Sequence, residues 1–239
     1  MLSEETIERL KRIKIIEKKF ESKVLTFYQN PNSDFGMIGE QTVTDFQNVL
    51  NSIDPFRKLM IIADSKGGLM DPGWRVAILV KRRQGTVTVI VPEEARSAAT
   101  LLAFAAEKIV MLENAQLGVL DPQMDYQGQQ VSALDLMNSG DPVIRSRANR
   151  IVEQMREYIS VLLEDRLERS DIDRICDRFL LLDRTHASHM SSIFQDEVRE
   201  LKLPVISSMD LDIRALHRLY KSSFFCEHKP STIIEFYPF

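Results

Sequence analysis

The chain has 239 residues, of which 44% are hydrophobic and 28% charged, and its formal net charge is −4. This length and composition are typical of a globular protein that buries a full core. The small net charge argues against a protein that binds nucleic acid through a basic surface.

The N-terminal part predicts two helices and a strand between them. A segment over 1–22 contains an amphipathic helix over 4–21, in which Ile7, Leu10 and Ile13 fall near one stripe. A short strand is predicted over 24–28 and a second helix over 42–53. The stretch between them, 29–39, is rich in turn-forming residues and predicts a loop.

The middle of the chain alternates between strands and helices. The continuous apolar run from Leu59 to Ala63 predicts a strand that is covered on both faces. Further strands are predicted over 86–92, 108–112 and 117–120, with helices over 74–84 and 97–106. This alternation indicates an α/β protein with parallel β-α-β units and right-handed crossovers.

The last part of the chain has a different character, because all nine glycines lie between residues 36 and 140. We predict helices over about 142–168, 171–181, 192–202 and 210–222, and a short strand near Val205. Ser192 to Gln195 has the pattern of a capping box at the start of the third of these helices. No linker separates this part, so we expect a single domain over 1–239 with a mainly helical portion over 141–239.

Cysteine usage and the apolar runs indicate the compartment. Cys176 and Cys226 are the only cysteines, and two isolated thiols form neither a disulfide framework nor a zinc motif. The apolar runs are too short to span a bilayer, and the charged N-terminus is unlike a signal peptide. We expect a cytoplasmic protein with no metal, no cofactor and no direct membrane span.

Two loops that follow predicted strands contain candidate catalytic groups, at the edge where α/β sheets usually bind ligands. Gly67 and Gly68 follow the strand that ends near Ala63. Adjacent glycines expose backbone N–H groups that can bind a developing oxyanion, although a simple turn is the alternative interpretation. Ser97 follows the next strand and begins an apolar helix, whose positive end favours negative charge near the hydroxyl. The alternative role for Ser97 is that of an N-cap.

The order of these motifs resembles the serine dehydrogenase proteinase family. The resemblance rests on Gly67-Gly68, on the segment from Ser97 to Ala103, on the segment from Ala106 to Met111, and on the segment from Leu117 to Gln123. This bacterial and archaeal family is a branch of the Clp-protease/crotonase fold and is related to signal peptide peptidase A. The resemblance therefore implies a crotonase/Clp-protease-like core of repeated β-β-α units.

The resemblance also implies roles for individual residues. Ser97 takes the position of the nucleophile, and Gly67, Gly68 and Ala98 take those of the oxyanion-binding N–H donors. In Clp-type subunits a histidine follows the serine and an aspartate comes much later. Here Asp121 stands 24 positions after Ser97, and His186 comes later. We therefore hypothesise that Asp121 and His186 complete a triad in the order Ser-Asp-His, since a triad is defined by geometry.

Simpler interpretations exist for the two partners. Asp121 precedes Pro122 and is also suited to organising a turn. His186 is also interpretable as a loop residue without a role, and His189 is an alternative base. His217 is predicted to lie on a helix face.

This sequence departs from the family pattern at a few positions. Lys66 stands where relatives usually have proline, and Ala99 where glycine is common; Lys202 replaces an expected glycine. Lys66 is either a surface lysine or the base of a Ser-Lys dyad, which would require burial to lower its pKa.

The resemblance implies a serine peptidase-like hydrolase that acts on a peptide or protein substrate through an acyl-enzyme on Ser97. Relatives with this fold commonly form trimers or hexamers, so we expect a homo-oligomer. The departures at Lys66 and Ala99 leave a second hypothesis, an inactive scaffold that acts through oligomerisation or partner binding and has a polar or blocked site near Ser97. A crotonase-like acyl-CoA enzyme is a third hypothesis, but it gives Ser97 no role.

Overall fold

A six-stranded sheet forms the centre of the protein in the computed structural model, which describes residues 3–30, 33, 36–182, 190–224 and 231–237. The strand order is β10-β5-β3-β2-β1-β11. Neighbouring strands pair in parallel, except that β11 is antiparallel to β1. The strands of this sheet are β1 (Lys23–Gln29), β2 (Leu59–Asp64), β3 (Val87–Val91), β5 (Lys108–Leu112), β10 (Val205–Ser208) and β11 (Thr232–Phe236).

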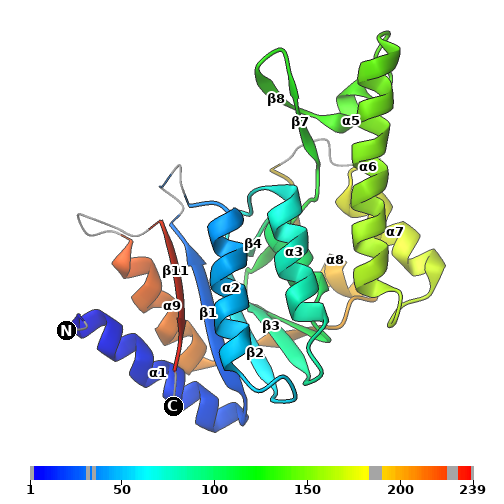
Figure 1. Ribbon diagram of the computed structural model, residues 1–239. Coiled ribbons are helices and arrows are strands. Elements are labelled where there is room, and N and C mark those ends of the chain that lie inside the picture. Colours follow the sequence, from blue (N-terminus) through cyan, green and yellow to red (C-terminus); the bar gives the residue numbers. More distant parts are fainter. Residues whose placement is uncertain (1–2, 31–32, 34–35, 183–189, 225–230, 238–239) are drawn as a thin grey trace.

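Helices cover the two faces of this sheet and create two apolar cores (Figure 1). The helices α1 (Glu4–Phe20) and α9 (Leu211–Ser223) lie on one face. Five others pack with the opposite face: α2 (Glu40–Ser52), α3 (Met70–Lys81), α4 (Ala98–Phe104), α6 (Pro142–Leu163) and α7 (Arg169–Phe179). Every residue of β2 is buried, as the continuous apolar run of this strand predicts for a central position.

Smaller elements extend this framework at the carboxyl ends of the parallel strands. A three-stranded sheet joins β4 (Glu94–Ala95), β6 (Gln116–Gly118) and β9 (Ser192–Phe194). A hairpin of β7 (Gln123–Tyr126) and β8 (Gln129–Ser132) leads into α5 (Ala133–Leu136). The hairpin and the first half of α6 project beyond the rest of the molecule (Figure 1). The short helix α8 (Gln195–Glu200) follows β9.

Several predicted boundaries needed correction. Helix α3 begins at Met70 and not near residue 74, because Pro72 lies in its first turn, where proline removes no helical hydrogen bond. The capping box predicted at Ser192 is wrong, because Ser192 begins strand β9, which pairs with β6. Its hydroxyl instead accepts a hydrogen bond from Arg96 Nη2 at 2.9 Å. Strand β11 and the β7–β8 hairpin were not predicted.

Within the described residues, no helix combines the length and the apolar character that crossing a membrane requires.

Candidate active site

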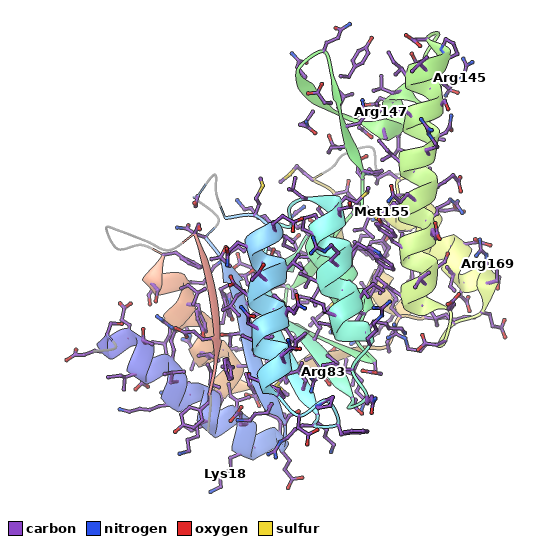
Figure 2. All side chains as sticks on the ribbon, in the orientation of Figure 1. Lys18, Arg83, Arg145, Arg147, Met155 and Arg169 are labelled. Carbon is purple, nitrogen blue, oxygen red and sulfur yellow. The ribbon has the colours of Figure 1, made fainter. Side chains whose placement is uncertain are left out.

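A cavity of about 460 Å³ opens at the carboxyl ends of the central strands. The loop after β2, the residues at the start of α4 and the segment after β6 all contribute to its wall. Its lining includes Gly67, Gly68, Ser97, Ala98 and Asp121. Apolar side chains complete part of the wall; one of them is that of Met155, which α6 directs toward the body of the molecule (Figure 2). The fold therefore brings together residues that are far apart along the chain.

Ser97 has a strained backbone directly before α4. Its φ is 49° and its ψ is −126°, a region that residues other than glycine rarely adopt. The side chain makes no capping hydrogen bond to the helix, so Ser97 does not act as the ordinary N-cap that was the alternative interpretation. It is half-buried and lines the cavity. Such strain persists only where the surroundings enforce it, and it is concentrated at functional sites.

The glycine loop, defined as residues 65–68, lies against the backbone around Ser97. Gly67 has φ 95°, and a Cβ atom there would lie 2.4 Å from Arg96 O and 2.8 Å from Ser97 Cβ. A Cβ atom on Gly68 would lie 2.3 Å from Ile38 N. No side chain fits at either position: Gly67 lets the loop approach the backbone around Ser97, and Gly68 lets it approach the backbone of Ile38.

The N–H groups around Ser97 differ in their hydrogen bonding. The N–H of Gly67 donates to Ser65 Oγ at 3.0 Å. Among the hydrogen bonds of the described residues, none uses the N–H of Gly68 or of Ala98. Two N–H groups beside the Ser97 hydroxyl thus remain available to an oxygen atom of a ligand, whereas that of Gly67 is occupied.

Asp121 lines the same cavity as Ser97 and is 5% exposed. Its Oδ1 accepts a hydrogen bond from Ser132 Oγ at 2.5 Å, and its Oδ2 accepts one from Gln123 Nε2 at 2.8 Å. These contacts join the start of the hairpin to its end, as the interpretation of Asp121 as a turn residue requires. The same contacts orient the carboxylate at the wall of the cavity.

The candidate bases predicted from the sequence are His186, His189 and Lys66, and the structure describes only the last of them. His186 and the alternative His189 lie outside the described residues. Lys66 is exposed, so it lacks the burial that a Ser-Lys dyad would require. His217 lies on α9, as predicted, and its side chain is 16% exposed.

Arg96 is a site residue that sequence analysis missed. Its guanidinium donates to Met190 O at 3.1 Å and to Ser192 Oγ at 2.9 Å, and it pairs with Glu94 at 2.7 Å. Arg96 therefore holds the chain at residues 190–192 beside the residue that precedes Ser97. Only its position next to Ser97 offered a signal in the sequence.

A cluster of titratable groups lies on the α9 side of the sheet, where β2 and β3 end. Lys221 Nζ lies 3.0 Å from Asp64 Oδ2 and 2.7 Å from Glu93 Oε2, and His217 Nε2 lies 3.4 Å from Glu93 Oε2. The ligand atoms of Asp64, Glu93 and His217 lie within 4.8 Å of one another, a spacing that a metal ion could use. The ammonium of Lys221 already pairs with both carboxylates, so we interpret the group as an ion cluster.

Burial shifts the pKa values of this cluster in opposite directions. Burial raises the pKa of Asp64 to about 6, although the neighbouring Lys221 lowers it. Burial and the charge of Lys221 lower the pKa of His217 to about 4, although Glu93 raises it. The hydroxyl of Tyr28, which is fully buried, has no hydrogen-bond partner in the part of the chain that the structure describes. Burial, and after it the charge of Asp64, raises the pKa of this hydroxyl.

Comparison with known proteins gave a family and several relatives. The profile of ClpP-like SDH-type serine proteinases matches residues 1–239. The uncharacterized protein MJ0137 of Methanocaldococcus jannaschii is 27% identical over 230 residues, which cover 90% of this chain and 79% of the relative. The uncharacterized protein MJ1495 of the same organism is 26% identical over 226 residues, which cover 90% of this chain and 74% of the relative.

Solved structures share the fold at lower identity. The 1510-N membrane-bound stomatin-specific protease, solved as a serine-to-alanine mutant, is 18% identical; the match has a TM-score of 0.52 and covers 78% of this chain and 80% of that one. ClpP1 from Listeria monocytogenes is 17% identical; its match also has a TM-score of 0.52 and covers 82% of this chain and 98% of that one. The predicted Clp-protease/crotonase-like α/β fold is thereby confirmed.

Proposed function

Because the chain belongs to the family of ClpP-like SDH-type serine proteinases, we propose that it cleaves peptide bonds through an acyl-enzyme on Ser97. The observation that carries this proposal is the strained backbone of Ser97, whose side chain lines an open cavity without capping α4. A serine held in this way presents its hydroxyl to a ligand and not to its own helix.

The proposed reaction uses two backbone donors for the oxyanion. Ser97 Oγ attacks the carbonyl carbon of the substrate, and the carbonyl oxygen becomes negatively charged. The N–H groups of Gly68 and Ala98 donate to this oxygen and form the oxyanion hole. Their lack of any other hydrogen bond among the described residues supports this assignment. Gly67 contributes the shape of the loop, because its own N–H is bonded to Ser65.

The proposed base is His186, with Asp121 supporting it. His186 takes the proton of Ser97 Oγ during attack and returns it to the leaving amine, after which water hydrolyses the acyl-enzyme. The support is indirect: Arg96 holds Met190 and Ser192 beside Ser97, and this brings the chain close to the cavity four residues after His186. The buried carboxylate of Asp121 lines the same cavity.

Lys66 is the alternative base. Substituting each residue in turn distinguishes Lys66 from His186 as the base. If His186 is the base, His186→Gln lowers the acylation rate by at least about 100-fold, whereas Lys66→Met changes it by less than about 3-fold. The rate of labelling by a fluorophosphonate probe measures both. Loss of labelling in Lys66→Met with retention in His186→Gln would assign the role to Lys66.

The labelling experiment also tests the nucleophile. We expect the fluorophosphonate probe to label the wild type and the control Ser170→Ala, which changes an exposed serine on α7. Ser97→Ala should remain unlabelled while retaining the folded circular dichroism spectrum. Labelling of Ser97→Ala to the same extent, or no labelling of any variant, would contradict the proposal and favour the inactive scaffold.

The open cavity argues against a scaffold whose site near Ser97 is blocked, but not against one whose site is polar. We further propose a peptide or protein substrate, a homo-oligomer of three or six subunits and a cytoplasmic location, as the ClpP-like family suggests. Light scattering coupled to gel filtration measures the subunit number. A monomer at micromolar concentration would contradict that part of the proposal.

A further inference from the structure

A buried pair of polar side chains lies directly beneath the glycine loop. Gln29 is the last residue of β1 and is 4% exposed, and Ser65 follows β2 and is 2% exposed. The hydroxyl of Ser65 donates to Gln29 Oε1, and Ser65 Oγ accepts the N–H of Gly67 at 3.0 Å. The three groups form a chain of hydrogen bonds from the central sheet to the loop.

The direction of this chain follows from what each group can donate. Because Ser65 Oγ accepts the proton of Gly67 N–H, its own proton is directed to the other partner, which is Gln29 Oε1. The amide of Gln29 therefore acts as an acceptor, and its buried Nε2 has no hydrogen-bond partner among the described residues. A buried donor left unpaired costs about 1 to 3 kcal/mol. The acceptor function of Gln29 is thus retained at a cost to stability.

Ser65 also holds the backbone that leads to Ser97. Its N–H donates to Glu94 O at 3.0 Å, and its carbonyl accepts the N–H of Arg96 at 3.0 Å. On the other side of the loop, Gly67 O accepts the N–H of Ile38 at 2.9 Å. The peptide units on both sides of Gly67 are therefore fixed, and the second of them carries the N–H of Gly68.

We propose that Ser65, held by Gln29, is a positioning residue that orients the N–H of Gly68 toward the oxyanion. The proposal rests on the proposed function, because it assigns Ser65 a role in the same reaction. Neither side chain reacts with substrate. Ser65 directs the N–H of Gly67 inward and thereby leaves the N–H of Gly68 facing the cavity.

Fluorophosphonate labelling kinetics test the proposal, because they separate the rate of bond formation (kinact) from the initial binding constant (KI). Loss of one oxyanion donor costs about 100- to 1,000-fold in rate. For Ser65→Ala, which leaves the donor misaligned, we expect kinact to fall by about 10- to 100-fold. KI should change by less than about 3-fold, because the ground state does not use the oxyanion hole.

Thr26→Val is the matched control. Thr26 lies on the same strand as Gln29, is fully buried and bonds through its hydroxyl to Tyr220 Oη at 2.6 Å. Thr26→Val therefore also removes a buried hydroxyl, but away from the loop. We expect it to lower stability without changing kinact. Equal loss of kinact in Thr26→Val and Ser65→Ala would overturn the proposal.

Substitutions of Gln29 add a test by conservative rescue. Gln29→Glu keeps an acceptor oxygen for Ser65, whereas Gln29→Met has a similar length and no acceptor. We expect Gln29→Glu to keep kinact within about 3-fold of the wild type, and Gln29→Met to lose about 10-fold or more. Equal kinact in the two variants would show that the acceptor has no role.

Hydrogen exchange separates failure of this proposal from failure of the proposed function. If the wild type is labelled on Ser97 but Ser65→Ala has the same kinact, the positioning role is wrong and the function stands. If the wild type is not labelled, the function fails. Exchange at the Gly67 amide then still tests the structural part, because Ser65→Ala should accelerate it and Thr26→Val should not. Unchanged exchange in Ser65→Ala would overturn this part as well.

Discussion

Ser97 adopts a backbone conformation with φ 49° and ψ −126°, which costs a residue with a Cβ atom about 1 to 3 kcal/mol. The strain is enforced by neighbours, because Gly67 lies against Arg96 and Ser97. A structural serine would not require this conformation. At the residue scale, the strain and the unused N–H groups of Gly68 and Ala98 distinguish this serine from an ordinary helix cap.

A comparison of two Ser97 variants that both lack the hydroxyl tests the strain. Ser97→Gly removes the Cβ atom that makes the conformation unfavourable, whereas Ser97→Ala retains it. We expect Ser97→Gly to be more stable than Ser97→Ala by about 1 kcal/mol, as measured by urea unfolding. Equal stability, or a less stable glycine variant, would show that the conformation stores no strain.

The ion cluster predicts a pH dependence that only variants reveal. The pKa of Asp64 is raised to about 6, so its contribution to stability is complete below its unfolded pKa of about 3.9 and is lost as pH rises through about 6. The pKa of His217 is lowered to about 4. Its contribution is complete above its unfolded pKa of about 6.5 and is lost as pH falls toward about 4. In the wild type the two changes oppose each other across the same range.

Each single substitution should therefore expose the other residue. Relative to the wild type, the free energy of unfolding of His217→Gln should rise by up to about 3 kcal/mol as pH falls from 6.5 to 4. That of Asp64→Asn should fall by a similar amount over the same range. Urea unfolding at a series of pH values measures both. Profiles parallel to that of the wild type would contradict the shifted pKa values of both groups.

At the scale of elements, the β7–β8 hairpin carries one wall of the site. Its two-residue loop has positive φ at both positions, 55° at Gln127 and 79° at Gly128, which is the pattern of a type I′ turn. Glycine suits this turn, but glutamine is less favourable there than asparagine. The hairpin ends at Ser132, whose hydroxyl binds the carboxylate of Asp121. The stability of the turn therefore affects how firmly the carboxylate of Asp121, a candidate catalytic residue, is held in place.

Substitutions in this turn should change the stability of the hairpin in opposite directions. Gln127→Asn should stabilise it by about 0.5 kcal/mol, and Gly128→Ala should destabilise it by about 1 kcal/mol. Both residues are exposed, so packing changes little. Hydrogen exchange over 123–132 measures the local effect. Exchange rates that change in the same direction for both variants would contradict the type I′ assignment.

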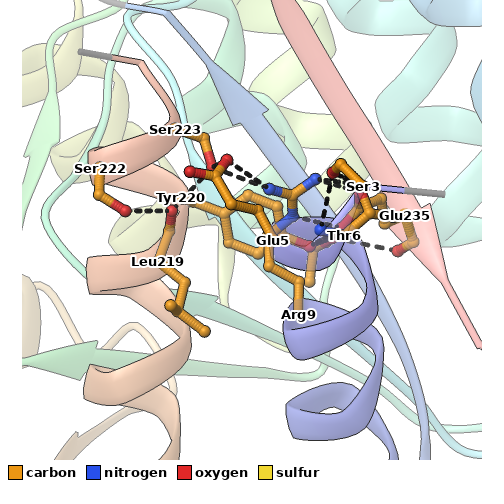
Figure 3. A network of polar contacts seen from close by, with 10 residues as sticks. Ser3, Glu5, Thr6, Arg9, Leu219, Tyr220, Ser222, Ser223 and Glu235 are labelled. Carbon is orange, nitrogen blue, oxygen red and sulfur yellow. Dashed lines mark hydrogen bonds and ion pairs between the residues drawn. The ribbon is translucent and has the colours of Figure 1, made fainter. Parts of the chain in front are cut away.

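At the scale of the whole molecule, a polar network joins the first helix to the last helix and the last strand (Figure 3). Arg9 of α1 is 5% exposed and binds Glu235 of β11 through two hydrogen bonds of 2.7 and 2.9 Å. It also donates to Ser223 at the end of α9 at 2.8 Å. Tyr220 donates to the same carboxylate of Glu235 at 2.7 Å. These hydrogen bonds thus join α1 to α9 and to β11 on one side of the sheet, away from the cavity.

A double-mutant cycle tests this connection. Arg9→Met should lower the free energy of unfolding by about 3 kcal/mol, because it leaves the carboxylate of Glu235, whose side chain is only 14% exposed, without its cation. Adding Glu235→Gln should restore a substantial part of this loss, since it removes the unpaired charge and keeps an acceptor for Tyr220. Urea unfolding measures the cycle. Strictly additive effects would show that the pair is not coupled.

Local patterns in the sequence were sufficient for much of the architecture. Central strands were predicted from continuous apolar runs such as that of β2, and the helices α1 and α2 from their amphipathic periodicity, because both signals arise from neighbouring residues. The motifs around Gly67, Ser97 and Asp121 also indicated the family and the residues of the candidate site. The sequence missed β11 and the hairpin, since the former depends on pairing with a distant strand and the latter lacks the usual Asn-Gly turn.

Only the tertiary structure decided how these residues are arranged at the site. It showed the strained backbone of Ser97 and assigned the N–H of Gly67 to Ser65. It also placed Gln29 beneath the glycine loop and Lys221 against Asp64. The physical reason is that these features depend on contacts between residues far apart along the chain, and a local pattern of residue types carries no information about such distances.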